Sequence, residues 1–293
     1  MIVFLKKSDN FLLSKHLKNK DCNTREIPIF ALSLGLTITM KHELKTEGKF
    51  TYLEEGEGTP IIILHGLMGG LSNFDAVTDF FSKNGYKVVI PELPVYSMPL
   101  IKTGVKSFAK YLKEFIDHKN YDEVVLLGNS MGGHVALYHT KVYPEKIKGL
   151  VITGSSGLYE SAMGESYPKR GDYEYIKNKA EGVFYNPEIA TKEIVDEVYE
   201  TVNDRNKLIK TLAIAKSAIR HNMAQDLPDM NTPTCIIWGK QDNVTPPEVA
   251  EDFNKLLPDA DLFWIDKCGH AAMMEQPEIF NEILLDWLKK RGF

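Results

Sequence analysis

Residues 125–134 read VLLGNSMGGH and set a single serine, Ser130, between two glycines. The pattern Gly-x-Ser-x-Gly recurs by chance, so it carries functional meaning only where it joins a strand to a helix. The bulky apolar residues at 124–127 are typical of a short strand that is buried on both faces of a parallel sheet. No proline interrupts residues 131–143, whose apolar positions suit a helix that Pro144 ends. The stretch therefore predicts a strand, a tight turn and a helix.

The turn itself has the composition that a close approach of strand and helix requires. Gly128 and Gly132 carry no side chains that would collide where the two elements cross. Ser130 is then expected at the tip, next to the free amides and the positive dipole end of the following helix. Such surroundings suit an oxygen that becomes negative during a reaction. A serine in an ordinary glycine-flanked turn stays open as the alternative, because the motif is short.

The composition limits the class of protein and its partners. With 293 residues the chain can form one substantial α/β domain with an insertion, or two small domains, and a single core is the simpler arrangement. The net charge of −5 comes from interspersed acidic and basic residues, so we expect neither a nucleic-acid nor a membrane partner. The expected partner is a small-molecule substrate, and a homo-oligomer stays open.

The motif content gives no reason to expect a cofactor or a metal. The three cysteines, Cys22, Cys235 and Cys268, cannot all pair and lie in no Cys-x-x-Cys motif, so neither a disulfide framework nor a zinc site is expected. The run GLMGG lacks the Lys-Ser/Thr pair of a phosphate loop, and no Rossmann glycine fingerprint follows a strand. We therefore expect a cofactor-free protein in a reducing compartment, the cytoplasm.

Residues 1–39 are expected to be an N-terminal extension outside the fold. They place several basic residues before the apolar run IPIFALSLGLTITM at 27–40. This run is too short for a membrane span, and no small-x-small cleavage site follows it. A signal peptide or an anchor is the alternative. The stretch 40–58 would serve as an ordinary cytosolic start.

Short apolar runs recur along the rest of the chain and alternate with helical stretches. This alternation predicts an α/β fold, a mostly parallel sheet flanked by helices, with ligands at the carboxyl ends of its strands. The long polar segment between residues 153 and 234 is read as several helices, because a structureless loop of that length is improbable. We expect it to form an inserted α-helical cap at 157–227, on a core of 40–156 and 228–293. The expected strands are 50–53, taken as an edge strand, 61–64, 87–90, 124–127, 150–153, 234–238 and 261–265.

Two later stretches offer the groups that a nucleophilic serine requires. A serine hydroxyl is a poor nucleophile at neutral pH, so it needs a histidine to take its proton and an acid to orient that histidine. The stretch IIWGKQDNVTP places Asp242 just past an expected strand, and FWIDKCGHAAMMEQP places His270 just past the next one. Strand-end loops would bring both side chains to Ser130.

From about residue 45 to its C-terminus the sequence resembles the α/β-hydrolase family. The resemblance implies that Ser130 is the nucleophile, His270 the general base and Asp242 the residue that orients it. It also implies an oxyanion hole formed by the backbone amides of Leu67 and Met131. The matching pieces, in the family's order and spacing, are HGLMGG at 65–70, GNSMGG at 128–133, WGKQD at 238–242 and CGH at 268–270.

Each assignment has a structural alternative. Asp242 could instead cap a helix that begins near Pro246. Cys268 is expected to pack as a small apolar residue beside His270. The remaining conspicuous histidines are expected to be structural, either hydrogen-bonded or exposed: His65, His134, His139 and His221.

The leading functional hypothesis is a cofactor-free serine hydrolase, similar to a carboxylesterase, that acts on a small ester or a related carbonyl substrate through an acyl-enzyme. One alternative is a ligand-binding or receptor protein on the same fold. A second is a carbon–carbon bond hydrolase, because GNSMGG is similar to the nucleophile motif of hydrolases that split ring-fission products of aromatic compounds. Those relatives usually carry a Gly-Pro-Gly oxyanion loop and a tryptophan after the catalytic histidine. This chain has HGLMGG and Ala271 there, and it shows no evident residue for a substrate carboxylate.

Overall fold

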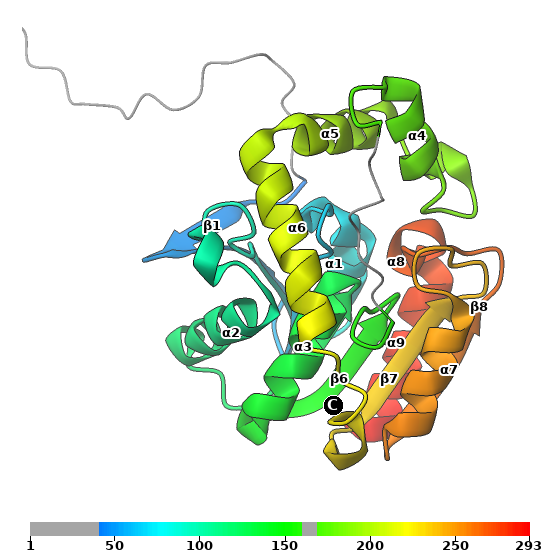
Figure 1. Cartoon of the computed structure of the whole chain (residues 1–293). Coiled ribbons are helices and arrows are strands. Elements are labelled where there is room, and N and C mark those ends of the chain that lie inside the picture. Colours follow the sequence, from blue (N-terminus) through cyan, green and yellow to red (C-terminus); the bar gives the residue numbers. More distant parts are fainter. Residues whose placement is uncertain (1–40, 160–168) are drawn as a thin grey trace, which may run out of the picture. The chain divides into compact units, whose positions relative to one another are not determined.

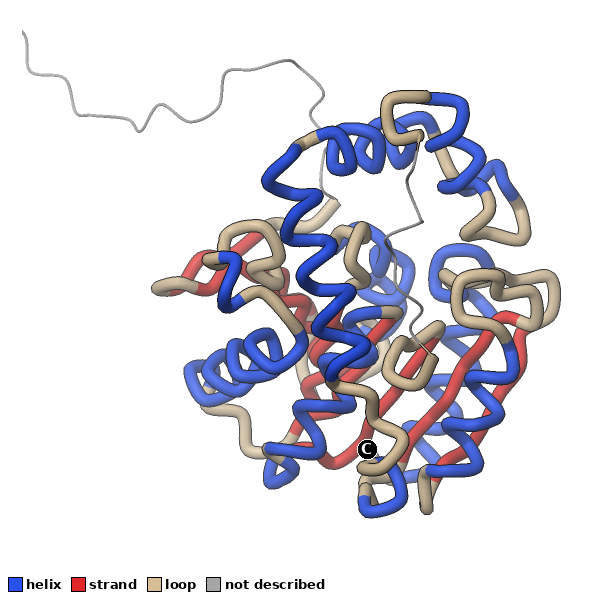
Figure 2. Tube along the Cα trace, in the orientation of Figure 1, coloured by secondary structure: helices blue, strands red, loops and turns tan. Residues whose placement is uncertain are grey.

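An eight-stranded sheet forms the centre of the chain (Figures 1 and 2), in the order β1-β2-β4-β3-β5-β6-β7-β8. The computed structural model describes residues 41–159 and 169–293, so the prediction for residues 1–39 lies outside the described residues. In this order, β1 pairs antiparallel with β2, and β2 pairs antiparallel with β4. All neighbouring strands after β4 pair in parallel. The strands are β1 (Leu44–Glu47), β2 (Phe50–Glu55), β3 (Thr59–Leu64), β4 (Tyr86–Pro91), β5 (Val124–Asn129), β6 (Ile147–Thr153), β7 (Thr234–Gly239) and β8 (Ala260–Ile265).

Helices cover both faces of the sheet (Figure 2), and the sheet separates the core into two apolar layers. Helices α2, α3 and α7 pack on one face, and α1, α8 and α9 pack on the other. Successive residues along each strand point to opposite faces, so Ile62 packs in the first layer while Ile61 and Ile63 pack in the second. The helices are α1 (Asp75–Phe81), α2 (Val105–Lys119), α3 (Met131–Val142), α4 (Tyr173–Glu181), α5 (Lys192–Asn203), α6 (Arg205–Arg220), α7 (Pro247–Leu256), α8 (Ala272–Glu275) and α9 (Pro277–Arg291).

All seven expected strands lie within observed strands, which confirms the α/β fold class. The expectation that residues 50–53 form an edge strand is wrong, because β2 pairs with β4 on one side and with β1 on the other. The sequence LKTE of β1 escaped notice since all of its residues are exposed. It therefore lacks the apolar alternation by which a half-buried strand is recognised.

Three helices between β6 and β7 form the inserted cap. Figure 1 shows α4 and α5 at one end of the sheet, while α6 runs from α5 toward α2 and α3. The Asp204 carboxylate caps the N-terminus of α6, where it accepts hydrogen bonds from the amides of Asn206 and Lys207 at 2.7 and 2.9 Å. The cap has a small core of Ile176, Val198 and Val202. These helices fall inside the expected range 157–227, whose outer bounds stay a prediction.

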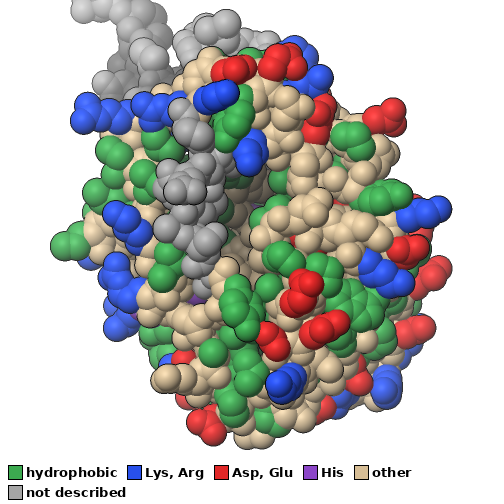
Figure 3. Space-filling model, turned by 45° about the vertical axis from the view of Figure 1, so that its right-hand side comes forward, with side chains coloured by type: hydrophobic (Ala, Val, Ile, Leu, Met, Phe, Trp, Pro, Cys, Tyr) green, Lys and Arg blue, Asp and Glu red, His purple; other side chains and the backbone are tan. Residues whose placement is uncertain are grey.

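The surface carries charges of both signs. Figure 3 shows basic and acidic side chains together with hydrophobic ones on the displayed face. Within residues 41–159 and 169–293, the helices are all too short or too polar to cross a membrane.

The first turn of α3 packs very closely against the sheet. A Cβ atom at Gly132 would lie 2.1 Å from the carbonyl oxygen of Leu64 in β3, and one at Gly128 would lie 2.4 Å from the carbonyl oxygen of Gly132. Both neighbours are backbone atoms, which cannot rotate away as a side chain can. The helix and the sheet therefore approach this closely only with glycine at both positions.

We expect Gly132→Ala to lower the free energy of unfolding by about 1–3 kcal/mol, the usual cost of overpacking. The thermal midpoint should fall by roughly 2–4 °C per kcal/mol, as measured by circular dichroism or calorimetry. Gly171→Ala is the matched control, because a Cβ at Gly171 meets nothing within 4 Å. Equal midpoints for the two variants would contradict the close approach.

Candidate active site

Ser130 lies in the turn between β5 and α3, in a backbone conformation that is rare for a residue with a side chain. Its φ and ψ are 55° and −122°, and only two other non-glycine residues among those described have a positive φ. The Ser130 amide donates a hydrogen bond to the carbonyl of Thr153 at the end of β6, at 3.1 Å. Strained residues of this kind persist where the surrounding structure holds them, and they cluster at functional sites.

The loop after β3 lies beside this turn and brings Leu67 to the same place. Leu67 and Ser130 line two cavities in common, and Met131 also lines the second of them. As the first residue of α3, Met131 has an amide with no acceptor inside the helix. The loop is held in part by His65, whose Nδ1 lies 2.8 Å from the carbonyl of Gly66. Burial lowers the pKa of His65, so it is a neutral structural histidine.

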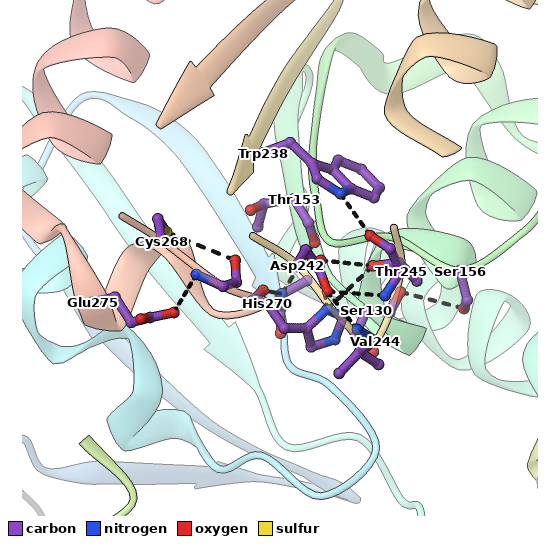
Figure 4. A network of polar contacts seen from close by, with 12 residues as sticks. Ser130, Thr153, Ser156, Trp238, Asp242, Val244, Thr245, Cys268, His270 and Glu275 are labelled. Carbon is purple, nitrogen blue, oxygen red and sulfur yellow. Dashed lines mark hydrogen bonds and ion pairs between the residues drawn. The ribbon is translucent and has the colours of Figure 1, made fainter. Parts of the chain in front are cut away.

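The structure brings Asp242 and His270 into direct contact (Figure 4). Asp242 Oδ2 lies 2.9 Å from His270 Nδ1. The same oxygen accepts a hydrogen bond from the Thr245 hydroxyl at 2.8 Å, and Oδ1 accepts from the amides of Val244 and Thr245 at 2.8 and 2.9 Å. Asp242 is only 2 % exposed, and these donors satisfy both oxygens of its carboxylate.

The alternative of Asp242 as a helix cap is wrong. Helix α7 begins at Pro247, and its N-cap is Pro246, which offers no capping side chain. The amides that Asp242 binds belong to the loop before that helix. Thr245 was missed by the sequence reasoning, although its hydroxyl also lies 3.2 Å from His270 Nδ1. Its position three residues after Asp242 in the piece DNVT was the available signal, since Asp side chains commonly bond to amides two or three residues on.

Ser130 and His270 line the same cavity, of about 190 Å³, between the sheet and helices α4 and α5. Its two charged lining residues among those described are Lys179 and Glu197. A second cavity, of about 260 Å³, adjoins Ser130 on the side of α6. Its apolar lining from the cap and from α7 consists of Ile214, Ala215, Ala218 and Val249. Ser130 is therefore open to two cavities that the cap encloses in part.

Backbone and amide hydrogen bonds tie the loops of the site to one another. Asn129 donates from Nδ2 to the carbonyl of Thr153 at 3.0 Å and to the carbonyl of His270 at 3.2 Å. The side-chain Oε1 of Gln241 accepts a hydrogen bond from the backbone amide of Cys268 at 3.0 Å. The backbone amide of Gln241 donates to the carbonyl of Cys268, also at 3.0 Å. Sequence reasoning did not single out Asn129 or Gln241, because both act on backbone atoms of residues more than 20 positions away.

The other histidines and Cys268 lie in bonded or buried surroundings. His134 Nε2 lies 2.9 Å from the carbonyl of His221, and His139 Nδ1 lies 3.0 Å from that of Ala109. Burial lowers the pKa of His139 to about 4 and raises that of the Cys268 thiol to about 12. Cys268 is accordingly a neutral thiol beside His270. In the described ranges, no three histidine, cysteine or acidic side chains gather as they would around a metal ion.

Comparison with known proteins places this chain in a family. A family model described as the alpha/beta hydrolase fold matches residues 59–277. A 2-hydroxy-6-oxononadienedioate/2-hydroxy-6-oxononatrienedioate hydrolase of a Pseudomonas species is 27% identical, over 85% of this chain and 94% of that protein. A 2-hydroxy-6-oxo-6-phenylhexa-2,4-dienoate hydrolase of Comamonas testosteroni is 25% identical, over 82% of this chain and 91% of that protein.

One solved structure is much more similar in sequence. It is an alpha/beta hydrolase enzyme from the metagenome of lagoon sediments at Mar Chica, Morocco. The two chains are 66% identical, and the match covers 86% of this chain and 100% of the other with a TM-score of 0.73. The protein is a hydrolase, and the chain belongs to the α/β-hydrolase fold family.

Proposed function

We propose that this hydrolase uses Ser130 as its nucleophile, His270 as its general base and Asp242 to orient His270, and that it cleaves a small carboxylic ester through an acyl-enzyme. The observation that carries the proposal is the contact of 2.9 Å between His270 Nδ1 and the buried Asp242 carboxylate, because His270 lines the same cavity as Ser130. The strained conformation of Ser130 supports the same role. No cofactor is needed for this reaction.

The proposed reaction has two halves. His270 takes the proton of the Ser130 hydroxyl while the Ser130 oxygen attacks the ester carbonyl carbon. The oxyanion that forms accepts hydrogen bonds from the amides of Leu67 and Met131. When this intermediate collapses, the bond to the alcohol oxygen breaks and His270 returns the proton to the leaving alcohol. Water, deprotonated by His270, then attacks the acyl group on Ser130 and releases the acid.

Asp242 fixes the tautomer that this sequence requires. Its Oδ2 accepts from the protonated Nδ1 of His270, which leaves Nε2 unprotonated as the base for Ser130. The amides of Val244 and Thr245 hold the other carboxylate oxygen, so the carboxylate cannot rotate away from the ring. The Asp242 charge also stabilises the imidazolium that appears during each half of the reaction.

The second candidate is hydrolysis of a carbon–carbon bond in a 2-hydroxy-6-oxo-dienoate. The names of the curated relatives favour it, and the match covers more than 90% of the length of each of these two relatives. The cavity offers one described cation for a substrate carboxylate, Lys179, whose Nζ lies 5.8 Å from the ring centre of Tyr175. Lys179 is exposed, and the second cavity is lined largely by aliphatic side chains. This lining favours the uncharged ester as the first candidate.

We expect Ser130→Ala to lower kcat by roughly four to six orders of magnitude and to leave the fold intact, because the nucleophile is lost while the cavity is kept. Steady-state turnover of a chromogenic short-chain ester measures the loss. A fluorophosphonate probe followed by mass spectrometry should modify Ser130 in the unaltered protein. A variant that keeps a tenth of the original kcat would refute Ser130 as nucleophile, and an unaltered protein without turnover or labelling would favour a receptor.

Asp242→Asn should preserve the structure and lower kcat by about four orders of magnitude near neutral pH. The amide can donate to His270 Nδ1, which stabilises the tautomer with its proton on Nε2. Circular dichroism checks the fold, and the pH dependence of kcat checks the mechanism. Asp252→Asn is the matched control, since Asp252 accepts from the Tyr159 hydroxyl at 2.6 Å and has no contact with His270 among those described. Equal effects of the two variants would assign the orienting role to another acid.

A direct comparison of substrates decides between the two candidates. We expect kcat/KM for the best simple ester to exceed that for a 2-hydroxy-6-oxo-dienoate. Cleavage of the dienoate is measured as the loss of its visible absorbance. Lys179→Met should then leave ester turnover within about twofold, because an exposed surface charge contributes little to binding a neutral substrate. Faster dienoate cleavage that Lys179→Met abolishes would establish the second candidate instead.

A further inference from the structure

The Glu275 carboxylate lies five residues after His270, at the end of α8, and it binds two separate segments at once. Its Oε1 accepts a hydrogen bond from the amide of Gly269 at 2.7 Å (Figure 4). Its Oε2 accepts from the amides of Tyr185 and Asn186 at 2.7 and 3.3 Å. Gly269 precedes the proposed general base, whereas Tyr185 and Asn186 follow α4 in the cap.

The same two segments also touch directly. The amide of His270 donates a hydrogen bond to the carbonyl of Val183 at 2.9 Å. A Cβ atom at Gly269 would lie 2.7 Å from that carbonyl oxygen and 2.9 Å from the nitrogen of Tyr185, so the backbones meet without a side chain between them. The backbone of the His270 loop is therefore bound to residues 183–186 of the cap directly at the His270 amide and through Glu275 at the Gly269 amide.

The chemistry of the contact requires a carboxylate. Three amide donors converge on the two oxygens of Glu275, and hydrogen bonds to a charged acceptor are shorter and stronger than neutral ones. A glutamine would offer one accepting oxygen and would turn an NH2 group toward an amide that also donates. Partial burial raises the pKa of Glu275, and the three hydrogen bonds oppose that rise.

The rest of the His270 loop has supports of its own. Gln241 holds Cys268 through two hydrogen bonds, and Asp242 holds the His270 ring. Loss of Glu275 therefore leaves the strands and the Asp242–His270 contact in place. It removes the acceptor of the Gly269 amide, which lies next to the residue whose ring must face Ser130.

We propose that Glu275 is a positioning residue that joins the loop of the general base to residues 183–186 of the cap, so that His270 faces Ser130 only while the cap is docked. This inference rests on the proposed function of His270. Glu275 is not among the described residues that line the two cavities beside Ser130, and it acts through the backbone of Gly269. A displacement of about 1 Å at a catalytic group can cost on the order of a hundredfold in rate.

The test compares Glu275→Ala and Glu275→Gln with Glu282→Gln, an exposed carboxylate on α9. Three experiments are done on the full chain: fluorophosphonate labelling at Ser130 gives a rate, steady-state kinetics give kcat and KM for the best ester, and hydrogen exchange is followed in peptides that contain residues 183–187 and 267–271. We expect Glu275→Ala to lower labelling and kcat by roughly 10- to 100-fold with KM within about threefold. Exchange should quicken in those two peptides and stay unchanged in β5 and β7. Glu275→Gln should fall between Glu275→Ala and the unaltered protein.

Every outcome bears on the proposal. Labelling and kcat that stay unchanged in Glu275→Gln would overturn it, even if Glu275→Ala unfolds, and so would a loss confined to KM. Faster exchange throughout the chain would make Glu275 a residue of general stability and would also overturn it. Absence of labelling at Ser130 in the unaltered protein would refute the proposed function, whereas the exchange of the two peptides would still report whether Glu275 joins them.

Discussion

The contact between the backbone of β3 and the first turn of α3 is the constraint on which the site depends. Gly132 lies so close to the carbonyl of Leu64 that no side chain fits between them, and this approach leaves the chain one residue in which to turn from β5 into α3. Ser130 takes that position with a positive φ. The cost of the strained conformation, on the order of 1–3 kcal/mol, is offset by the packing of the two elements on either side.

The parallel sheet then supplies the remaining groups. Ser130 follows β5, Asp242 follows β7 and His270 follows β8, and the parallel direction of these strands puts all three loops at one edge of the sheet. Strand ends alone would leave loops of several residues free to move. Asn129 and Gln241 remove that freedom, since each binds the backbone of the loop that carries His270.

Sequence reasoning reached the three side chains that we propose carry the chemistry and missed those that hold them in place. Ser130, Asp242 and His270 are recognisable because each stands in a motif after an apolar run, which is itself a signal of a buried strand. Glu275 and Thr245 stand in no such motif, and their partners are amides and side chains that only the folded chain brings near. Strand β1 was missed for a related reason, because an exposed strand pairs through its backbone and leaves no apolar pattern.

The cap contacts the loops of the site as well as the cavities, and this sets how freely its parts can vary. Met68, next to Leu67 in the expected oxyanion loop, packs on the cap core of Ile176, Val198 and Val202. Val183 binds the backbone of His270, so a change there alters the position of the proposed base together with the wall of the cavity. By contrast, the cavity residues of α6 have no hydrogen bond to the His270 loop among the described contacts. Substitutions in α6 can therefore change the substrate range without moving His270. Substitutions in the segment after α4 change the cavity wall and the position of His270 together.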